Sequence, residues 1–265
     1  MTSDLKFLAF DTSTDMMSVA LCHGQQTWHH HGLGGANASA QLIPTIHTLL
    51  AQAHLQLSDL TALVVGHGPG SFTGLRTACA VAQGLALGAH LKVIAVDSLM
   101  AVAEDARLKL QDAAITQPEP LNVGVVMDAR MSEVYVGAYQ WHVNASRWSP
   151  LMSLQVGPPE TVAHKLTQLN VPNWVLAGNG FEVYKDRFSL QLFQHAGLSP
   201  QPVPCISAVP HALALLRLAP ALWQAGEALT PELVQPLYIR DKVAQTTAER
   251  AAIKASQAHR SKTAV

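Results

Sequence analysis

The sequence predicts a mixed α/β fold made of two related halves, each a mixed sheet with flanking helices. The first observation is a repeated unit: an apolar strand, a turn that opens with aspartate and a second strand occur at residues 5–22 and again at 121–139. The second is the alternation of short apolar strands with helical periodicity across residues 38–110. The third is composition, because 49% hydrophobic and 13% charged residues in a chain of 265 suit a well-buried core.

The first half is expected to run β-β-β-α-β-α-β-α. Its strands are apolar runs bounded by turn residues, at 5–10, 17–22, 28–31, 62–65 and 93–96. Its helices show the 3.6-residue apolar period, at 38–53, 72–88 and 98–110. Pro44 lies near the front of the first helix, where proline is tolerated, and Ser98 is the expected N-cap of the third.

The second half repeats this opening and then becomes less regular. Its expected strands lie at 121–127, 133–139 and 174–177, and a helix is expected at 207–223 with Pro210 in its first turn. A polar segment with two prolines at 111–120 marks the boundary between the halves. We therefore predict three parts: an N-terminal subdomain at 1–110, a reduced C-terminal subdomain at 121–226, and a C-terminal arm with a flexible basic tail at 227–265.

Charge is nearly balanced overall, with a formal net charge of −1, so it favours neither nucleic acid nor a membrane as partner. The last residues are an exception, because six basic residues stand against two acidic ones from residue 240 onward. Such a tail is either a solvated terminus or an auxiliary contact to RNA or a partner.

The sequence shows none of the usual features of secreted or membrane proteins. The three cysteines are isolated, without metal or redox spacing, which favours free thiols in a reducing compartment. The first residues lack the basic and apolar regions of a signal peptide, and the longest weakly polar run, at 78–91, is too short to span a bilayer. A soluble cytoplasmic protein is expected.

The two aspartate turns are candidate phosphate loops. Asp11, Thr12 and Ser13 follow the first strand, and Asp128 and Arg130 follow its counterpart. Hairpins with short hydroxyl side chains offer N–H and O–H donors to phosphate, and a carboxylate can hold a metal-bound water. Each motif alone is equally typical of an ordinary turn. Their recurrence favours two loops that face one cleft and grip a nucleotide.

The glycine-rich segment Gly66-His67-Gly68-Pro69-Gly70-Ser71-Phe72-Thr73-Gly74 comes between a buried strand and a helix. The N-terminus of a helix favours anions. The segment has no lysine after its glycines, so it is not a Walker A loop, and its spacing does not match the dinucleotide-binding fingerprint.

The helix that follows holds three glycines, Gly74, Gly84 and Gly88, and each costs about 1 kcal/mol relative to alanine. Gly84 and Gly88 share a stripe with Ala80. Close approach of another backbone would offset this cost. The pattern leaves open whether that backbone belongs to the same domain or to another subunit.

Motifs for metal-dependent and serine hydrolase chemistry are missing. No two of the 13 histidines stand three or four residues apart, and neither HExxH nor GxSxG occurs. No metal site and no catalytic residues are predicted.

Four segments together resemble the TsaB family, also called YeaZ. They are Phe10-Asp11-Thr12-Ser13-Thr14, the glycine segment with Leu75-Arg76, Ala82-Gln83-Gly84-Leu85-Ala86, and residues 127–135 (MDARMSEVY). The resemblance covers residues 5–140 well, and Pro236-Leu237-Tyr238-Ile239-Arg240 matches the family's end.

This resemblance implies an actin/hexokinase/Hsp70-like (ASKHA) duplicated fold and a subunit that is not an enzyme on its own. Its implied partners are the catalytic paralogue TsaD and the ATPase TsaE, with a homodimer when alone and tRNA contacted mainly through the complex. The complex transfers a threonylcarbamoyl group from threonylcarbamoyl-AMP to N6 of the adenosine 3′ to the anticodon, in tRNAs that read codons beginning with A. No cofactor of its own is implied; ATP or ADP with Mg would lie at the interface with the partner, with Asp11, Thr12, Ser13, Asp128 and Arg130 as vestigial or interface contacts.

The family's dimer surface implies an interface on the first two long helices. The residues expected there are Leu42, Ile46, Leu49, Phe72, Thr73, Arg76, Thr77, Ala80, Gly84 and Gly88. Two departures from the family pattern stand out: residues 38–44 lack the histidine that relatives often carry there, and the adenosine-binding turn of the fold is reduced to Ala177-Gly178-Asn179-Gly180.

Two rival functions remain at this point. One is an active phosphotransferase of the same fold, with Asp11 and Asp128 at a metal and phosphate site. The other is a metalloprotease, for which the ligands are missing. The sequence does not decide the resting oligomeric state.

Overall fold

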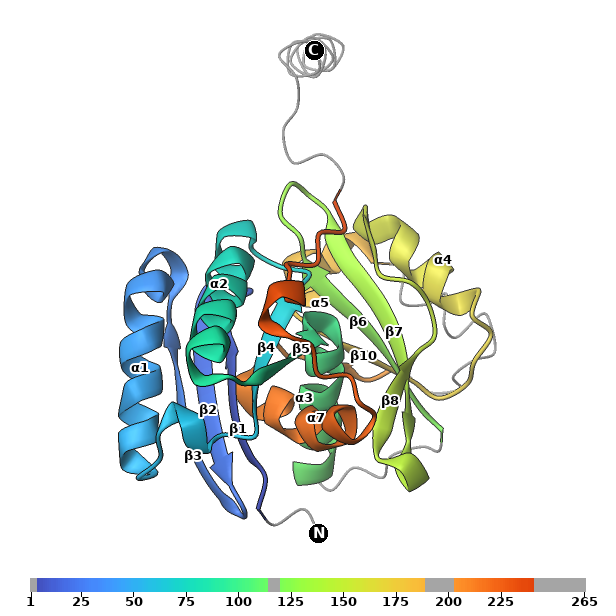
Figure 1. The fold of residues 1–265 in the computed structure, drawn as a ribbon. Coiled ribbons are helices and arrows are strands. Elements are labelled where there is room, and N and C mark those ends of the chain that lie inside the picture. The colour runs from blue at the N-terminus through green and yellow to red at the C-terminus, as the bar shows by residue number, and fades with distance from the viewer. Residues whose placement is uncertain (1–3, 114–119, 189–202, 241–265) are drawn as a thin grey trace, which may run out of the picture.

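The structure, a computed structural model, describes residues 4–113, 120–188 and 203–240 (Figure 1). Its first sheet has the strand order β3-β2-β1-β4-β5. β1 pairs antiparallel with β2 and parallel with β4. The five strands are β1 (Lys6–Asp11), β2 (Met16–His23), β3 (Gln26–Leu33), β4 (Ala62–Gly68) and β5 (Lys92–Asp97).

The second sheet has the order β11-β10-β6-β7-β8, and β9 also pairs with β7. β6 pairs antiparallel with β7 and parallel with β10, so both sheets share one topology, and the predicted duplication is confirmed. The strands are β6 (Leu121–Asp128), β7 (Val134–His142), β8 (Arg147–Pro150), β9 (Gln155–Gly157), β10 (Trp174–Ala177) and β11 (Cys205–Ile206). Of these, β8, β9 and β11 were not predicted.

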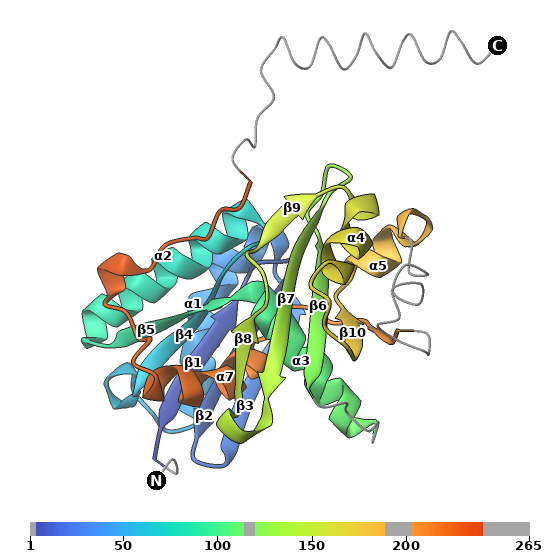
Figure 2. The same ribbon diagram turned by 90° about the vertical axis from the view of Figure 1, so that its right-hand side faces the viewer.

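The helices form three layers around the two sheets (Figures 1 and 2). α1 and α2 pack on the outer face of the first sheet, α3 and α7 lie between the sheets, and α4 covers the outer face of the second. The helices are α1 (Ala38–Gln52), α2 (Phe72–Ala89), α3 (Ser98–Asp112), α4 (Val162–Thr167), α5 (Gly180–Val183) and α7 (Ala212–Gln224). No helix among the described residues is long and apolar enough to cross a membrane.

Both central helices cross from one half to the other. α3, from the first half, packs on β6 and β7 of the second sheet as well as on β4 and β5 of its own, whereas α7, from the second half, packs on β1, β2 and β4 of the first. The predicted boundary at residue 226 therefore does not divide the structure, because α7 buries its apolar face against the first sheet. Of the predicted arm and basic tail at 227–265, residues 241–265 lie outside the described part of the chain.

Two predicted helix starts are wrong. α3 is capped by Asp97, whose carboxylate accepts a hydrogen bond from the Leu99 amide, and Ser98 is the first helical residue. α7 starts at Ala212, with His211 as N-cap, so Pro210 precedes the helix. Asp97 also accepts a hydrogen bond from the Tyr139 hydroxyl of the second half, which ties the halves together. Burial raises the pKa of Asp97 to about 6.

The C-terminal arm, defined here as residues 227–240, follows α7 and returns to the first half. Leu229 exchanges two backbone hydrogen bonds with Val93 on β5. After the 3-10 turn Pro231–Leu233, Val234 is fully buried in the core under α1 and α2. The arm from Leu229 to Leu237 therefore packs on the first half.

Candidate functional site

The glycine segment lies against the turn of the first hairpin, between β1 and β2. A Cβ on Gly66 would stand 1.8 Å from the Asp11 carboxylate, and one on Gly74 would stand 1.8 Å from the Thr12 carbonyl oxygen. The two backbones are also hydrogen-bonded, since the Ser71 amide donates to the Ser13 carbonyl oxygen at 2.7 Å. These glycines are thus explained by close packing within the chain, without a bound phosphate.

This packing covers the first candidate phosphate loop. Asp11, Thr12 and Ser13 are 1–2% exposed, and the Thr12 hydroxyl donates to the Gly74 carbonyl oxygen at 2.7 Å. Asp11 and Thr12, which were predicted to contact a nucleotide, are thus buried beneath the glycine segment. Ser13 reaches the pocket described below, but its hydroxyl donates to Asp11 at 2.6 Å.

Asp11 instead organises the hairpin from inside. One carboxylate oxygen accepts from the Ser13 amide at 2.8 Å, and the other from the Ser98 hydroxyl at 3.5 Å. Burial raises the pKa of Asp11 to about 6, and these hydrogen bonds only partly oppose the shift. The folded state therefore binds a proton more tightly than the unfolded chain, whose value is 3.8.

Asp11→Asn is expected to stabilise the chain at neutral pH. Because its folded pKa is raised, the contribution of Asp11 to the free energy of unfolding is largest below pH 4. Up to about 3 kcal/mol of that free energy is lost as the pH rises through 6. Asparagine can accept from the Ser13 amide and donate to Ser98 without carrying a charge. Urea unfolding from pH 4 to 8 should show a flatter profile for Asp11→Asn, while Asp186→Asn, at an exposed aspartate, keeps the wild-type slope. A variant less stable at pH 8 would contradict this.

The second hairpin, between β6 and β7, keeps its polar groups at the surface of the cleft. Asp128 accepts hydrogen bonds from the Arg130 amide and the Tyr184 hydroxyl, both at 2.8 Å. Arg130 contacts both halves, with 2.8 Å to Asp15 and 3.4 Å to Asp128. Its turn has three successive residues of positive φ, Arg130, Met131 and Ser132, at 62°, 54° and 61°. Such residues are strained, so contacts from elsewhere must hold this turn.

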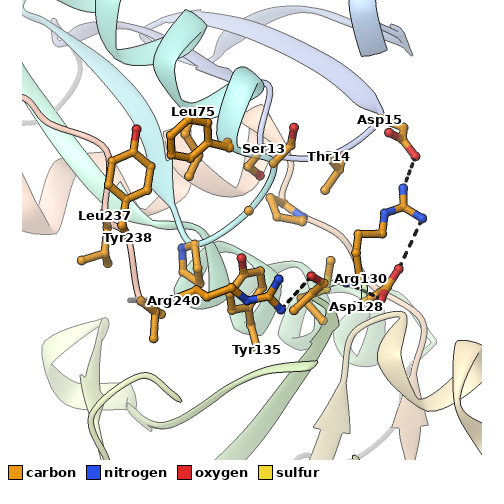
Figure 3. Close-up of a pocket in the computed structure, with 18 of the residues that line it drawn as sticks. Ser13, Thr14, Asp15, Leu75, Asp128, Arg130, Tyr135, Leu237, Tyr238 and Arg240 are labelled. Atoms are coloured by element: carbon orange, nitrogen blue, oxygen red, sulfur yellow. Dashed lines mark hydrogen bonds and ion pairs between the residues drawn. The ribbon is translucent and has the colours of Figure 1, made fainter. Parts of the chain in front are cut away.

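A pocket of about 350 Å³ lies between the two hairpins (Figure 3). The first half lines it with residues of its hairpin and of the glycine segment, and the second half with Asp128, Arg130 and Tyr135. The remaining wall is the C-terminal arm, from Leu237 to Arg240. Sequence reasoning placed two turns at one cleft, and the structure does bring them together. The sequence had not indicated that the C-terminal arm also lines this cleft.

The pocket does not fit a phosphate chain with magnesium. Asp11 is covered, Asp128 is already bonded to Tyr184 and Arg130, and Arg130 is paired with two carboxylates. Among the described residues, no group of three or more His, Cys, Asp or Glu is placed to hold a metal ion. At the reduced turn, a Cβ on Gly178 would stand 2.0 Å from the Val126 carbonyl oxygen, so this glycine packs directly against β6.

The outward face of α2 differs from its first turn. A Cβ added to Gly84 or Gly88 would meet nothing within 4 Å, so packing within the described chain does not explain these glycines. They share an exposed surface with other residues predicted for the interface, namely Phe72, Thr73, Arg76 and Ala80, with Thr77 partly exposed. The sequence left open whether the glycines of this helix pack within the domain or against another subunit. Gly74 packs within the chain, whereas Gly84 and Gly88 face outward.

The three residues of α1 that were predicted to lie at the interface are buried in the core instead. Leu42, Ile46 and Leu49 are 0–4% exposed and pack in the core between α1, α2 and the first sheet. The apolar period that identified this helix marks the face it buries in its own domain. The outward residues of α1 include Ile43 and His47, which the sequence analysis did not select.

Comparisons with known proteins give one family model and several relatives, each matched over most of this chain. Residues 30–248 match the model of the family described as TsaD, tRNA N6-adenosine threonylcarbamoyltransferase. The chain is 32% identical to the tRNA threonylcarbamoyladenosine biosynthesis protein TsaB of Escherichia coli K12, over 91% of this chain and 96% of that protein. It is also 32% identical to TsaB of Haemophilus influenzae, over 91% and 95%.

A solved structure shows the same fold. YeaZ from Pseudomonas aeruginosa is 34% identical, with a TM-score of 0.72, over 88% of this chain and 99% of that one. Together with the two sheets of equal topology, these similarities confirm the predicted actin/hexokinase/Hsp70-like fold.

Proposed function

The chain belongs to the TsaB (YeaZ) family, and on that premise we propose that it is a non-catalytic subunit in the biosynthesis of threonylcarbamoyladenosine in tRNA. Its partners in this proposal are a TsaD-like catalytic paralogue and a TsaE-like ATPase, acting on tRNA in the cytoplasm. In the absence of the paralogue, the chain forms a homodimer through the face that otherwise binds the paralogue.

The observation that carries the subunit role is the outward stripe of α2. Gly84 and Gly88 weaken the helix by about 1 kcal/mol each relative to alanine. Within the described chain, no atom lies within 4 Å of the position that a Cβ would take at either glycine. A partner helix that approaches this backbone closely would offset that cost. We therefore place the TsaD-like paralogue on the exposed face of α2 and the neighbouring surface of α1.

The cleft between the halves supports a non-catalytic role. A phosphotransferase would need Asp11 and Asp128 to act on one phosphate, but Asp11 is buried beneath the glycine segment. We accordingly do not propose the phosphotransferase, and we assign any nucleotide and magnesium of the complex to the interface with the partner.

Depletion of this chain in its own organism tests the pathway. We expect threonylcarbamoyladenosine to fall in bulk tRNA, as measured by nucleoside mass spectrometry, and to return when the wild-type chain is supplied. Other modified nucleosides in the same digests serve as the control. Unchanged threonylcarbamoyladenosine after depletion would remove the assignment.

A further inference from the structure

The C-terminal arm lies along the partner face proposed above. The Gln83 side chain of α2 donates to the Val234 carbonyl oxygen at 2.8 Å. At the end of β4, the Leu237 amide donates to the His67 carbonyl oxygen at 2.8 Å, and His67 Nδ1 donates to the Gln235 carbonyl oxygen at 3.1 Å. The arm is thereby fixed beside α2 by hydrogen bonds to its main chain.

Gly68 makes room for this path. Its φ is +127°, and a Cβ there would stand 2.7 Å from the Leu237 carbonyl oxygen. Any residue with a side chain would displace the arm. The lack of a side chain at Gly68 therefore allows the arm to pack against the glycine segment.

Tyr238 then covers the start of α2. Its ring stacks on Phe72 at 4.8 Å between centroids, and its hydroxyl accepts from Arg76 Nε at 3.0 Å. Arg76 also lies over the other ring, 3.7 Å from the centroid of Phe72. Tyr238 is 47% exposed and Phe72 38% exposed, so the cluster is a half-open aromatic surface continuous with the outward face of α2.

Arg240 joins the same arm to the second half (Figure 3). Its guanidinium donates to Glu133 at 2.5 Å and to the Ala129 carbonyl oxygen at 3.2 Å. Its side chain is 15% exposed and also contacts the Met131 sulfur. These contacts hold the strained turn of the second hairpin, and they fix the arm two residues after Tyr238.

We propose that the arm is a strap that forms part of the partner surface and is held in place by the second hairpin. Tyr238, with Phe72 and Arg76, forms one end of the surface, and Arg240 is the positioning residue that holds Tyr238 there. The occupant is the TsaD-like paralogue of the proposed function, on which this inference rests. Its contact region should offer an apolar recess for the two rings beside the helix that meets Gly84.

Titration of the full-length chain with the purified paralogue tests this surface. Tyr238→Ala is expected to weaken binding about tenfold, as for an aromatic residue at an interface, whereas Tyr238→Phe, which keeps the stacked ring, stays within about twofold of the wild type. The control is His164→Leu on α4, which adds an exposed apolar side chain on the outer face of the second half. Equal binding by Tyr238→Ala and wild type would overturn the contact role.

Arg240→Met tests the strap without touching α2. We expect weaker binding, by about threefold to tenfold, and faster hydrogen exchange at the Leu237 amide of the isolated chain, with exchange in the β1–β2 hairpin unchanged. Unaltered exchange at Leu237 would refute the anchor. If Gly84→Leu abolishes binding while the arm variants bind normally, only the strap fails. If Gly84→Leu also binds normally, the proposed partner face fails.

Discussion

Replacement of Gly84 by leucine is expected to abolish association with the partner while the isolated chain stays folded. The new side chain points into open space in the single chain, where nothing lies within 4 Å of its Cβ. At an interface it would hold the partner helix away from the backbone of α2. We expect affinity to fall by about a hundredfold or more, in the range of a central interface contact. Size-exclusion chromatography of the mixed subunits measures it.

The matched control is again His164→Leu, because it adds the same side chain at an exposed position of α4, which packs on the second sheet, whereas α2 packs on the first. It should co-elute with the paralogue like the wild type. Co-elution of Gly84→Leu would contradict the assignment of α2 to the interface. Thermal unfolding of both variants separates a loss of partner from a loss of fold.

A single substitution, glycine to alanine, is expected to have opposite effects at two positions of α2. In Gly74→Ala the methyl group would overlap the Thr12 carbonyl oxygen, since its ideal position is 1.8 Å away. The hairpin backbone must move, and we expect the free energy of unfolding to fall by about 3 kcal/mol or more. In Gly84→Ala no atom is displaced, and the better helix propensity should raise it by about 1 kcal/mol.

Chemical unfolding of the two variants beside the wild type gives the comparison. Each serves as the control for the other, because helix, residue and substitution are the same. Equal changes at the two positions would show that packing against the first hairpin does not explain Gly74. A destabilised Gly84→Ala would mean that this glycine has a role within its own chain.

Local patterns in the sequence were enough to predict most helices and strands and their repetition. Apolar strands with turn residues at their ends, and helices with an apolar period, are local signals, and those at residues 5–110 were found with small errors at their ends. The duplication followed from two Asp turns after equivalent strands. The two turns do meet at one cleft, because the halves share one topology. β8, β9 and β11 escaped notice because strands of two to four residues leave no clear pattern.

Which face each residue presents follows from packing between distant parts of the chain. Asp11 is typical of an exposed turn, yet the glycine segment covers it, and no local pattern records a contact between residues 55 or more positions apart. The packing of α3 and α7 on the sheet of the opposite half is equally invisible, since either sheet could bury either apolar face. Gly74 and Gly84 share one helix. Only the position of that helix on the first sheet sets Gly74 against a neighbouring backbone and leaves Gly84 open to a partner.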